Sequence, residues 1–106
     1  MSTTQEITRV WISEGVSAGT LQAGKPDRYV WNWPIQVEVG DAVEYCQSRA
    51  IWDGGVEFEI ERELPVGSQV RVRRQLRHVE PWVDVRIEAA VSGEDGTVIV
   101  EGAFHV

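Results

Sequence analysis

Hydrophobic and polar residues alternate along short segments of this chain, and turn residues separate the segments. The segment 56–64 (VEFEIEREL) is the clearest case, because Val56 and Phe58 alternate with Glu57 and Glu59. Such alternation predicts strands with one buried face, and evenly spaced clusters of Gly, Pro and Asp predict the turns between them. The chain is therefore predicted to be mainly β. We expect strands near 6–12, 17–23, 29–38, 43–52, 56–64, 69–79, 83–91 and 97–106.

The segment 41–55 (DAVEYCQSRAIWDGG) fits either a strand or a helix. Asp41 with Glu44 three residues later is typical of a helix start, and Gly54 is typical of a helix end. The apolar positions of this segment follow helical spacing about as well as strand spacing. We favour a strand; a helix here would make the fold α+β.

The segments 56–64 and 69–79 are predicted to form a hairpin about the turn 65–69 (PVGSQ). With Leu64 facing Val70, the glutamates of the first strand face the arginines of the second across the outer surface. Each such pair contributes roughly a few tenths of a kcal/mol, but the set disfavours a slipped register. The predicted pairs are Glu63–Arg71, Glu61–Arg73 and Glu57–Arg77.

The same register places Arg62, Arg74 and His78 on the apolar face of the hairpin. A buried unpaired charge is costly, so these groups either pair or line a cavity that holds water or a ligand. An Arg–Glu pair near a sheet end is the simpler interpretation. A polar patch in an apolar pocket is the functional one. If 43–52 is a strand folded back about the DGG turn, the same face also carries Glu44, Cys46, Ser48, Ala50 and Trp52.

Large aromatic residues are concentrated in the segment 29–39 (YVWNWPIQVEV), and the chain holds five tryptophans. Alternation places Tyr29, Trp31 and Trp33 on one face, where they form either a core stripe or the wall of a ligand cavity. Cys46 is interpreted as a small buried hydrophobe; as a nucleophile it would need a base such as His78. The candidate ligand-binding residues are Arg62, Arg74, Cys46, Trp31, Trp33 and Trp52.

Composition narrows the classes of function. A chain of 106 residues predicts a single domain, 1–106. The net charge of −7 disfavours binding to nucleic acid and to anionic membranes, and we expect neither partner. No segment approaches the roughly 18 apolar residues of a membrane span, and the N-terminus lacks the pattern of a secretory signal.

The reactive residue types are few. One cysteine excludes an internal disulfide and fits a reducing compartment, so we expect a cytoplasmic location. One cysteine and two histidines argue against a dedicated zinc site. No phosphate-binding glycine loop or nucleophile elbow is present, and we expect no cofactor.

The stretches ELPVGSQVRV (63–72), VDVRIEAAVS (83–92) and DGTVIVEGAFHV (95–106) carry a resemblance to a known family. Together they make the segment 56–106 similar to the C-terminal strands of hotdog-fold proteins, above all the MaoC-like acyl-thioester dehydratases. The resemblance implies a curved antiparallel sheet around a central helix, a homodimer, and an acyl thioester of CoA or of an acyl carrier protein as ligand. The family's catalytic stretch, similar to Gly-Asp-x-Asn-Pro-x-His, has no match beyond Gly40–Asp41. No catalytic residue is therefore carried over, and the central helix is either missing or compressed into 41–52.

Three functions follow, and the sequence leaves open whether the protein is an enzyme. The first is a hotdog-like protein that binds or acts on an acyl thioester, with polyketide-type thioesters included, as a dehydratase, a thioesterase or a non-catalytic member. In a catalytic version, His78 would be the general base, Glu44 would orient it, and Arg62 or Arg74 would stabilise an oxyanion.

The second function belongs to a closed eight-stranded up-and-down barrel that binds a hydrophobic small molecule, or folds it for cyclisation, in a tryptophan-lined cavity. The third is a non-enzymatic interaction domain whose sheet face or edge binds a partner protein. The segment 41–55 discriminates between the first two, because a helix there favours the hotdog fold and a strand favours the barrel.

Overall fold

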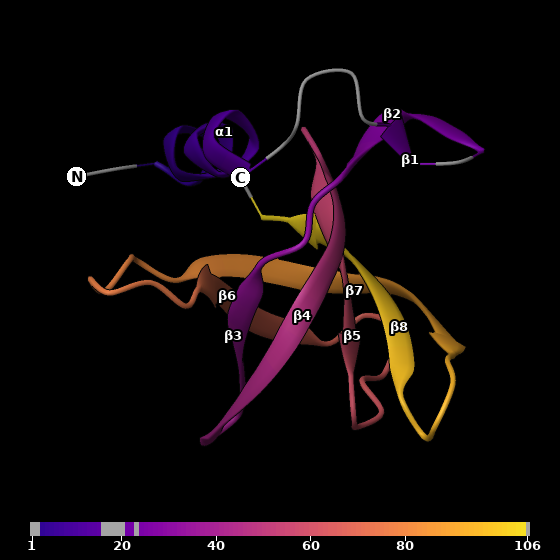
Figure 1. Ribbon diagram of the computed structural model, residues 1–106. Helices are drawn as coiled ribbons and strands as arrows, with labels where there is room; N and C mark the ends of the chain where they lie inside the picture. The colour runs from indigo at the N-terminus through magenta and orange to yellow at the C-terminus, as the bar shows by residue number, and fades with distance from the viewer. Residues whose placement is uncertain (1–2, 16–20, 23, 106) are drawn as a thin grey trace.

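The chain folds into a closed antiparallel β-barrel with one helix at one end (Figure 1). The computed structural model describes residues 3–15, 21–22 and 24–105. The prediction of a mainly β protein is confirmed. The elements are α1 (Thr4–Gly15), β1 (Leu21–Gln22), β2 (Lys25–Val30), β3 (Pro34–Val39), β4 (Ala42–Trp52), β5 (Gly55–Ile60), β6 (Gln69–Arg74), β7 (Val83–Ser92) and β8 (Val98–Phe104).

Six strands close the barrel, in the order β4-β3-β6-β7-β8-β5, and β5 returns to pair with β4. The short β1–β2 hairpin lies outside the ring, where β2 pairs with the last part of β4. The predicted closed barrel is thus present, but with six strands instead of eight. Its order is not up-and-down, because β3 pairs with β6 and β5 pairs with β8.

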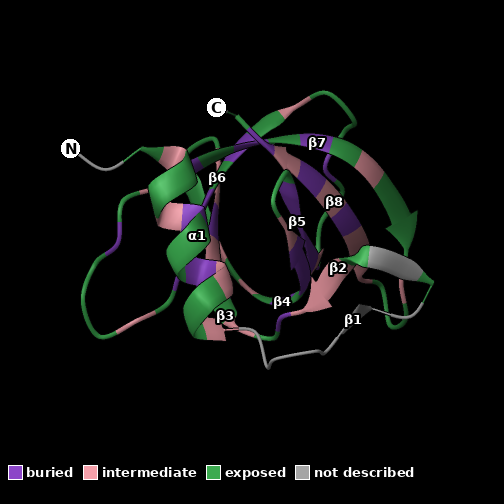
Figure 2. Ribbon diagram, turned by 90° about the horizontal axis from the view of Figure 1, so that it is seen from above, coloured by how far each residue is buried: buried purple, intermediate pink, exposed green. Residues whose placement is uncertain are grey.

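Inward side chains fill the barrel. Buried positions recur along β7 and β8, as Figure 2 shows from above. A barrel with this few strands is too narrow for much more than its own side chains. The largest fully buried side chains are Trp11, Trp31, Phe58, Ile35, Ile51, Ile87, Val37, Val56, Val72, Val83, Val85 and Val100.

The prediction of a strand at 6–12 is wrong, because this segment lies in helix α1. Thr3 begins the helix: its hydroxyl accepts a hydrogen bond from the Glu6 backbone N–H at 3.2 Å. Thr3 and Glu6 form the spacing of a capping box. Trp11, one turn after Ile7, then packs into the barrel end, and this burial stabilises a helix too short to persist alone. The predicted strand at 17–23 lies outside the described residues, apart from Leu21–Gln22.

The predicted strand at 29–38 is divided into β2 and β3 by the non-strand residues 31–33. Hydrogen bonds from the Ser48 side chain of β4 replace part of the strand pairing that is missing at residues 31–33. Its hydroxyl donates to the Trp31 carbonyl oxygen at 2.6 Å and accepts from the Trp33 N–H at 2.8 Å. A bulge between Ser48 and Ala50 accompanies this break, and both features bend the chain where β2 leaves the barrel.

The predicted hairpin of 56–64 with 69–79 is wrong. Strands β5 and β6 are separated by two strands in either direction around the barrel. The connection 61–68 therefore crosses the barrel end, which the buried Leu64 helps to close. The Glu–Arg ladder predicted from this hairpin is absent from the described ion pairs: Arg71 pairs with Glu38, and Arg73 bonds to Gln36.

The ambiguous segment 41–55 is a strand followed by a turn, as we favoured. Strand β4 pairs with β3 through its first part and with β5 through its last part. The predicted strands at 83–91 and 97–106 correspond to β7 and β8, which the GEDG turn connects.

Candidate functional site

Trp31 belongs to the core of the barrel end. Its ring stacks on Trp11 with centroids 5.6 Å apart, and its Nε1 donates to the Trp11 carbonyl oxygen at 3.0 Å. Phe104 meets Trp11 edge-on at 6.0 Å. Five pockets among the described residues, of about 210, 640, 300, 460 and 320 Å³, have no tryptophan in their lining. Trp31 is therefore part of a core stripe and not the wall of a ligand cavity.

Arg74 is the one predicted inward arginine that the structure buries, with 3% of its surface exposed. Its Nε and Nη2 donate to the Glu80 carboxylate at 3.0 and 2.5 Å, and Nη2 lies 3.5 Å from Glu14 of α1. The hydrogen bond with Glu80 is the largest cause that raises the pKa of Arg74. The guanidinium also lies 5.1 Å from the Trp33 ring centroid. Arg74 thus forms an Arg–Glu pair that fastens α1 to the β6–β7 connection.

Arg62 and His78 do not converge with Arg74 on one face. Strand β5 ends at Ile60 and β6 ends at Arg74, so both residues lie in exposed connections. Arg62 pairs with Glu44 at 3.3 Å. Within the described part of the chain, no hydrogen bond or ion pair joins Glu44 to His78.

Cys46 is half-buried and lies opposite Ile35 on the inward side of β4. Burial, and next the charge of Glu44, raise the pKa of its thiol from 9.0 to about 12. The thiol stays protonated at neutral pH, and a protonated thiol is a poor nucleophile. Cys46 therefore contributes packing to this region of the barrel.

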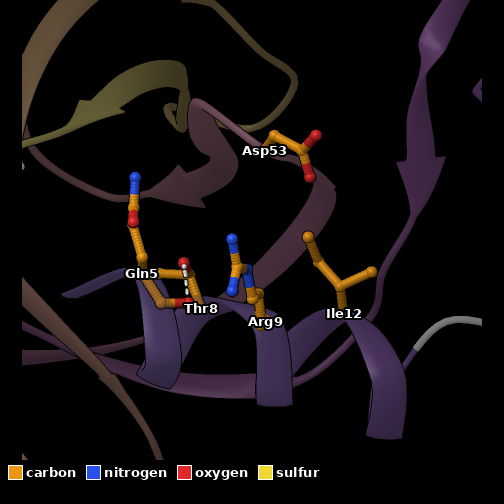
Figure 3. Close-up of a pocket in the computed structure, with 5 residues that line it drawn as sticks. All are labelled: Gln5, Thr8, Arg9, Ile12 and Asp53. Atoms are coloured by element: carbon orange, nitrogen blue, oxygen red, sulfur yellow. Dashed lines mark hydrogen bonds between the residues drawn. The ribbon is translucent and has the colours of Figure 1, made fainter. Parts of the chain in front are cut away.

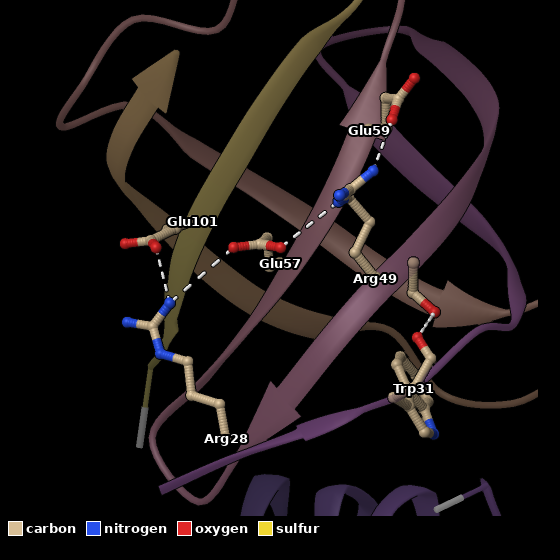
Figure 4. Close-up of polar contacts among 7 residues, drawn as sticks. Arg28, Trp31, Arg49, Glu57, Glu59 and Glu101 are labelled. Carbon is tan, nitrogen blue, oxygen red and sulfur yellow. Dashed lines mark hydrogen bonds and ion pairs between the residues drawn. The ribbon is translucent and has the colours of Figure 1, made fainter. Parts of the chain in front are cut away.

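Trp52 faces the outside of the barrel. The Arg28 guanidinium covers its ring at 3.8 Å, and Nη1 of Arg28 lies 2.6 Å from Glu101 and 3.9 Å from Glu57. Arg49 approaches Glu57 from the other side at 3.5 Å (Figure 4). This network holds β2 against the outer surface of β5 and β8, which assigns Trp52 a structural role.

A shallow pocket of about 210 Å³ lies between α1 and the β4–β5 turn (Figure 3). Its polar lining includes Arg9 and Asp53, which form no ion pair within the described residues. The volume is below the roughly 300–1,000 Å³ of most small-molecule sites. A larger, open pocket of about 640 Å³ is lined by Pro34, Glu44, Tyr45, Cys46, Gln47, Glu59, Ile60, Glu61, Gln75 and Thr97.

Four outward side chains form a row across the outer surface of four neighbouring strands. Gln36 of β3 lies opposite Tyr45 of β4 on one side and opposite Arg73 of β6 on the other. The Val72–Val83 pairing places Trp82, just before β7, beside Arg73. We call Tyr45, Gln36, Arg73 and Trp82 the Tyr45–Trp82 row. With strands roughly 4.8 Å apart, it spans about 14 Å.

The centre of the row is ordered and its ends are aromatic. The Arg73 guanidinium lies 4.0 Å from the Trp82 ring centroid, and its Nε donates to Gln36 Oε1 at 2.7 Å. Tyr45 is 68% exposed. Tyrosine, tryptophan and arginine are the residues most enriched where proteins bind each other strongly. The row therefore has the composition of a binding surface.

A second row runs beside the first and adds charge and apolar area. It contains Val43, Glu38, Arg71 and Asp84, in register across the same strands. Arg71 pairs with Glu38, with Nε at 2.6 Å from Oε1, and its guanidinium lies 5.4 Å from the Trp82 centroid. Arg71 is thus neutralised, whereas the side-chain acceptor of Arg73, Gln36, is uncharged.

Sequence reasoning placed Arg71 and Arg73 on the outer face correctly but assigned them the wrong neighbours. The row needs β3 beside β6, and these strands are separated in sequence by β4 and β5. Alternation could indicate the outward direction of Tyr45, but no local signal connects it to Trp82.

Comparison with known proteins gives no assignment: no family model matches the chain, and no curated protein matches it in sequence. The described part of the chain contains no helix with the length and hydropathy needed to span a bilayer. Within residues 3–15, 21–22 and 24–105, no group of three or more His, Cys, Asp or Glu side chains could hold a metal ion.

Proposed function

We propose that the protein is a non-enzymatic interaction domain that binds a partner polypeptide on the Tyr45–Trp82 row. The observation that carries the proposal is the exposed Tyr–Arg–Trp row on a barrel whose interior is filled by its own side chains. A rigid sheet presents these side chains, so little conformational entropy is lost when a partner covers them.

The side chains of the row indicate the chemistry of the partner. A guanidinium has five N–H donors in a planar fork that matches a carboxylate. Arg73 uses Nε on the neutral Gln36 and lies against Trp82, which holds the fork in place. The complementary group is therefore a carboxylate flanked by apolar or aromatic side chains. A long acidic run is disfavoured, because the chain itself has a net charge of −7.

The other two functions receive less support from the geometry. A catalytic acyl-thioester protein would need His78 near Glu44, and Glu44 pairs with Arg62 instead. A ligand inside the barrel would need to displace the packed core. Membership of the hotdog family stays a prediction, and β4 occupies the segment where its central helix was expected.

The proposal is tested by selecting short random peptides, displayed on phage, against the folded protein. Enriched peptides should contain Asp or Glu between apolar residues, and calorimetry should give a measurable Kd. Arg73→Gln and Tyr45→Ala should each weaken binding at least about tenfold. Arg62→Gln is the matched control, because it removes an exposed, paired arginine outside the row and should leave the affinity unchanged.

Circular dichroism would confirm that each variant is folded. The proposal is wrong if no peptide is enriched. It is also wrong if enriched peptides bind the Arg73→Gln and Tyr45→Ala variants as tightly as the unmodified protein.

A further inference from the structure

The last part of β7 has an open edge. Strand β6 pairs with β7 only from Val83 to Arg86, and Gly67 and Ser68 extend this contact to Ile87. Within the described residues, positions 89–92 pair with β8 alone, and Glu88 is the extra residue of a bulge. The bulge between Ile87 and Ala89 lies where this free edge begins. An unpaired strand edge presents backbone N–H and C=O groups in the spacing that another strand needs.

One hollow lies at this edge, and a second lies over β7 and the neighbouring strands β8 and β5. One, of about 300 Å³, is lined by Leu64, Pro65 and Val98 together with Glu63 and residues 90–92. The other, of about 320 Å³, is lined by Glu57, Ala89, Ala90, Val91, Ile99 and Glu101. The small side chains of Ala89 and Ala90 leave space on both faces of the strand.

We propose that the free edge 88–92 of β7 binds an extended peptide segment as an added strand. Another extended backbone matches the spacing of these N–H and C=O groups, and this is the usual mode of strand addition. Alternate side chains of an added strand point to opposite faces, so every second residue of the peptide would point toward the first hollow, which lies at the edge. This binding does not depend on the Tyr45–Trp82 row.

Charge identifies the class of peptide. Glu63 lines the first hollow and Glu94 follows the edge in the β7–β8 turn, whereas Glu88 at the start of the edge is paired with Arg86. Apolar walls and this acidic surround favour a segment in which apolar and basic residues alternate. A second copy of this chain is disfavoured as the occupant, because each copy has a net charge of −7.

The test uses an end-capped peptide of alternating lysine and valine, added to the full chain. Hydrogen exchange measured by NMR should slow at backbone amides within 88–92 when this peptide is present. Two control peptides keep its length: one is N-methylated along one edge, and one has glutamate in place of lysine. The N-methylated peptide should give no protection, and the glutamate peptide should bind at least about tenfold more weakly.

Two substitutions in the protein provide a second test of binding at the edge. Val91→Lys places a cation beside the basic peptide and should weaken binding at least about fivefold. Val79→Lys is the control: Val79 is 78% exposed against 60% for Val91, and it lies in the β6–β7 connection. The proposal is overturned if 88–92 gain no protection, or if the N-methylated peptide protects them equally. Protection that depends on protein concentration alone would also overturn it, because the occupant would then be a second copy.

Discussion

Replacing Glu80 with alanine should lower the free energy of unfolding by about 3–4 kcal/mol. Arg74 is buried and donates three hydrogen bonds to the Glu80 carboxylate: two from its guanidinium and one from its backbone N–H. Removing one partner of a buried ion pair typically costs about 3–5 kcal/mol, because the other charge is left without compensation. The lower part of that range applies because Glu14 remains 3.5 Å from Arg74. A domain of this size has a total stability of only about 5–15 kcal/mol.

The assay is urea unfolding at neutral pH, with the midpoint and slope compared between variants. Glu88→Ala is the matched control, because Glu88 pairs with Arg86 at 2.7 Å on the exposed surface and should cost no more than about 1 kcal/mol. The double variant Arg74→Met, Glu80→Leu should recover most of the loss, since a buried pair can be replaced by apolar residues. If Glu80→Ala cost no more than Glu88→Ala, the buried-charge argument would be refuted.

Two further predictions concern buried groups at and near the barrel ends. Trp11→Ala should cost about 3–5 kcal/mol in urea unfolding, because it removes a fully buried ring stacked on Trp31; a loss below about 1 kcal/mol would show that α1 contributes little to the fold. For Cys46, the folded pKa of about 12 exceeds the usual 9.0, so the unfolded thiol ionises first and stability falls as pH rises through this range. Cys46→Ala should therefore lose less stability than the unmodified protein between pH values near 8 and 10, and equal losses would contradict the prediction.

The two proposed binding surfaces differ in how far the sequence predicts them. The alternation in 69–79 correctly directs Arg71 and Arg73 to the outside and Val70 and Val72 to the core. It does not reveal that Arg73 lies between Gln36 and Trp82, because that depends on which strands are neighbours. The sequence does not predict the free edge of β7 either, because an unpaired edge also depends on which strands are neighbours.

The helix α1 shows a different limit. Thr3 and Glu6 carry the capping signal, but the short segment after them has too few apolar residues for its period to stand out. Packing decided the matter, because only the helical spacing brings the buried Thr8 and Trp11, three residues apart, onto one side toward the barrel.

Periodicity in the sequence by itself determined the β class, the strands β7 and β8, and the face to which most of their side chains point. These properties are local, because successive side chains of a strand must alternate. The tertiary structure decided the strand order, the closure on six strands and the partner of every buried or stacked charge. Pairing between β3 and β6, or between Arg74 and Glu14, joins residues distant in sequence. Such contacts form only in the folded chain, and burial of the apolar core is the main free energy that drives folding.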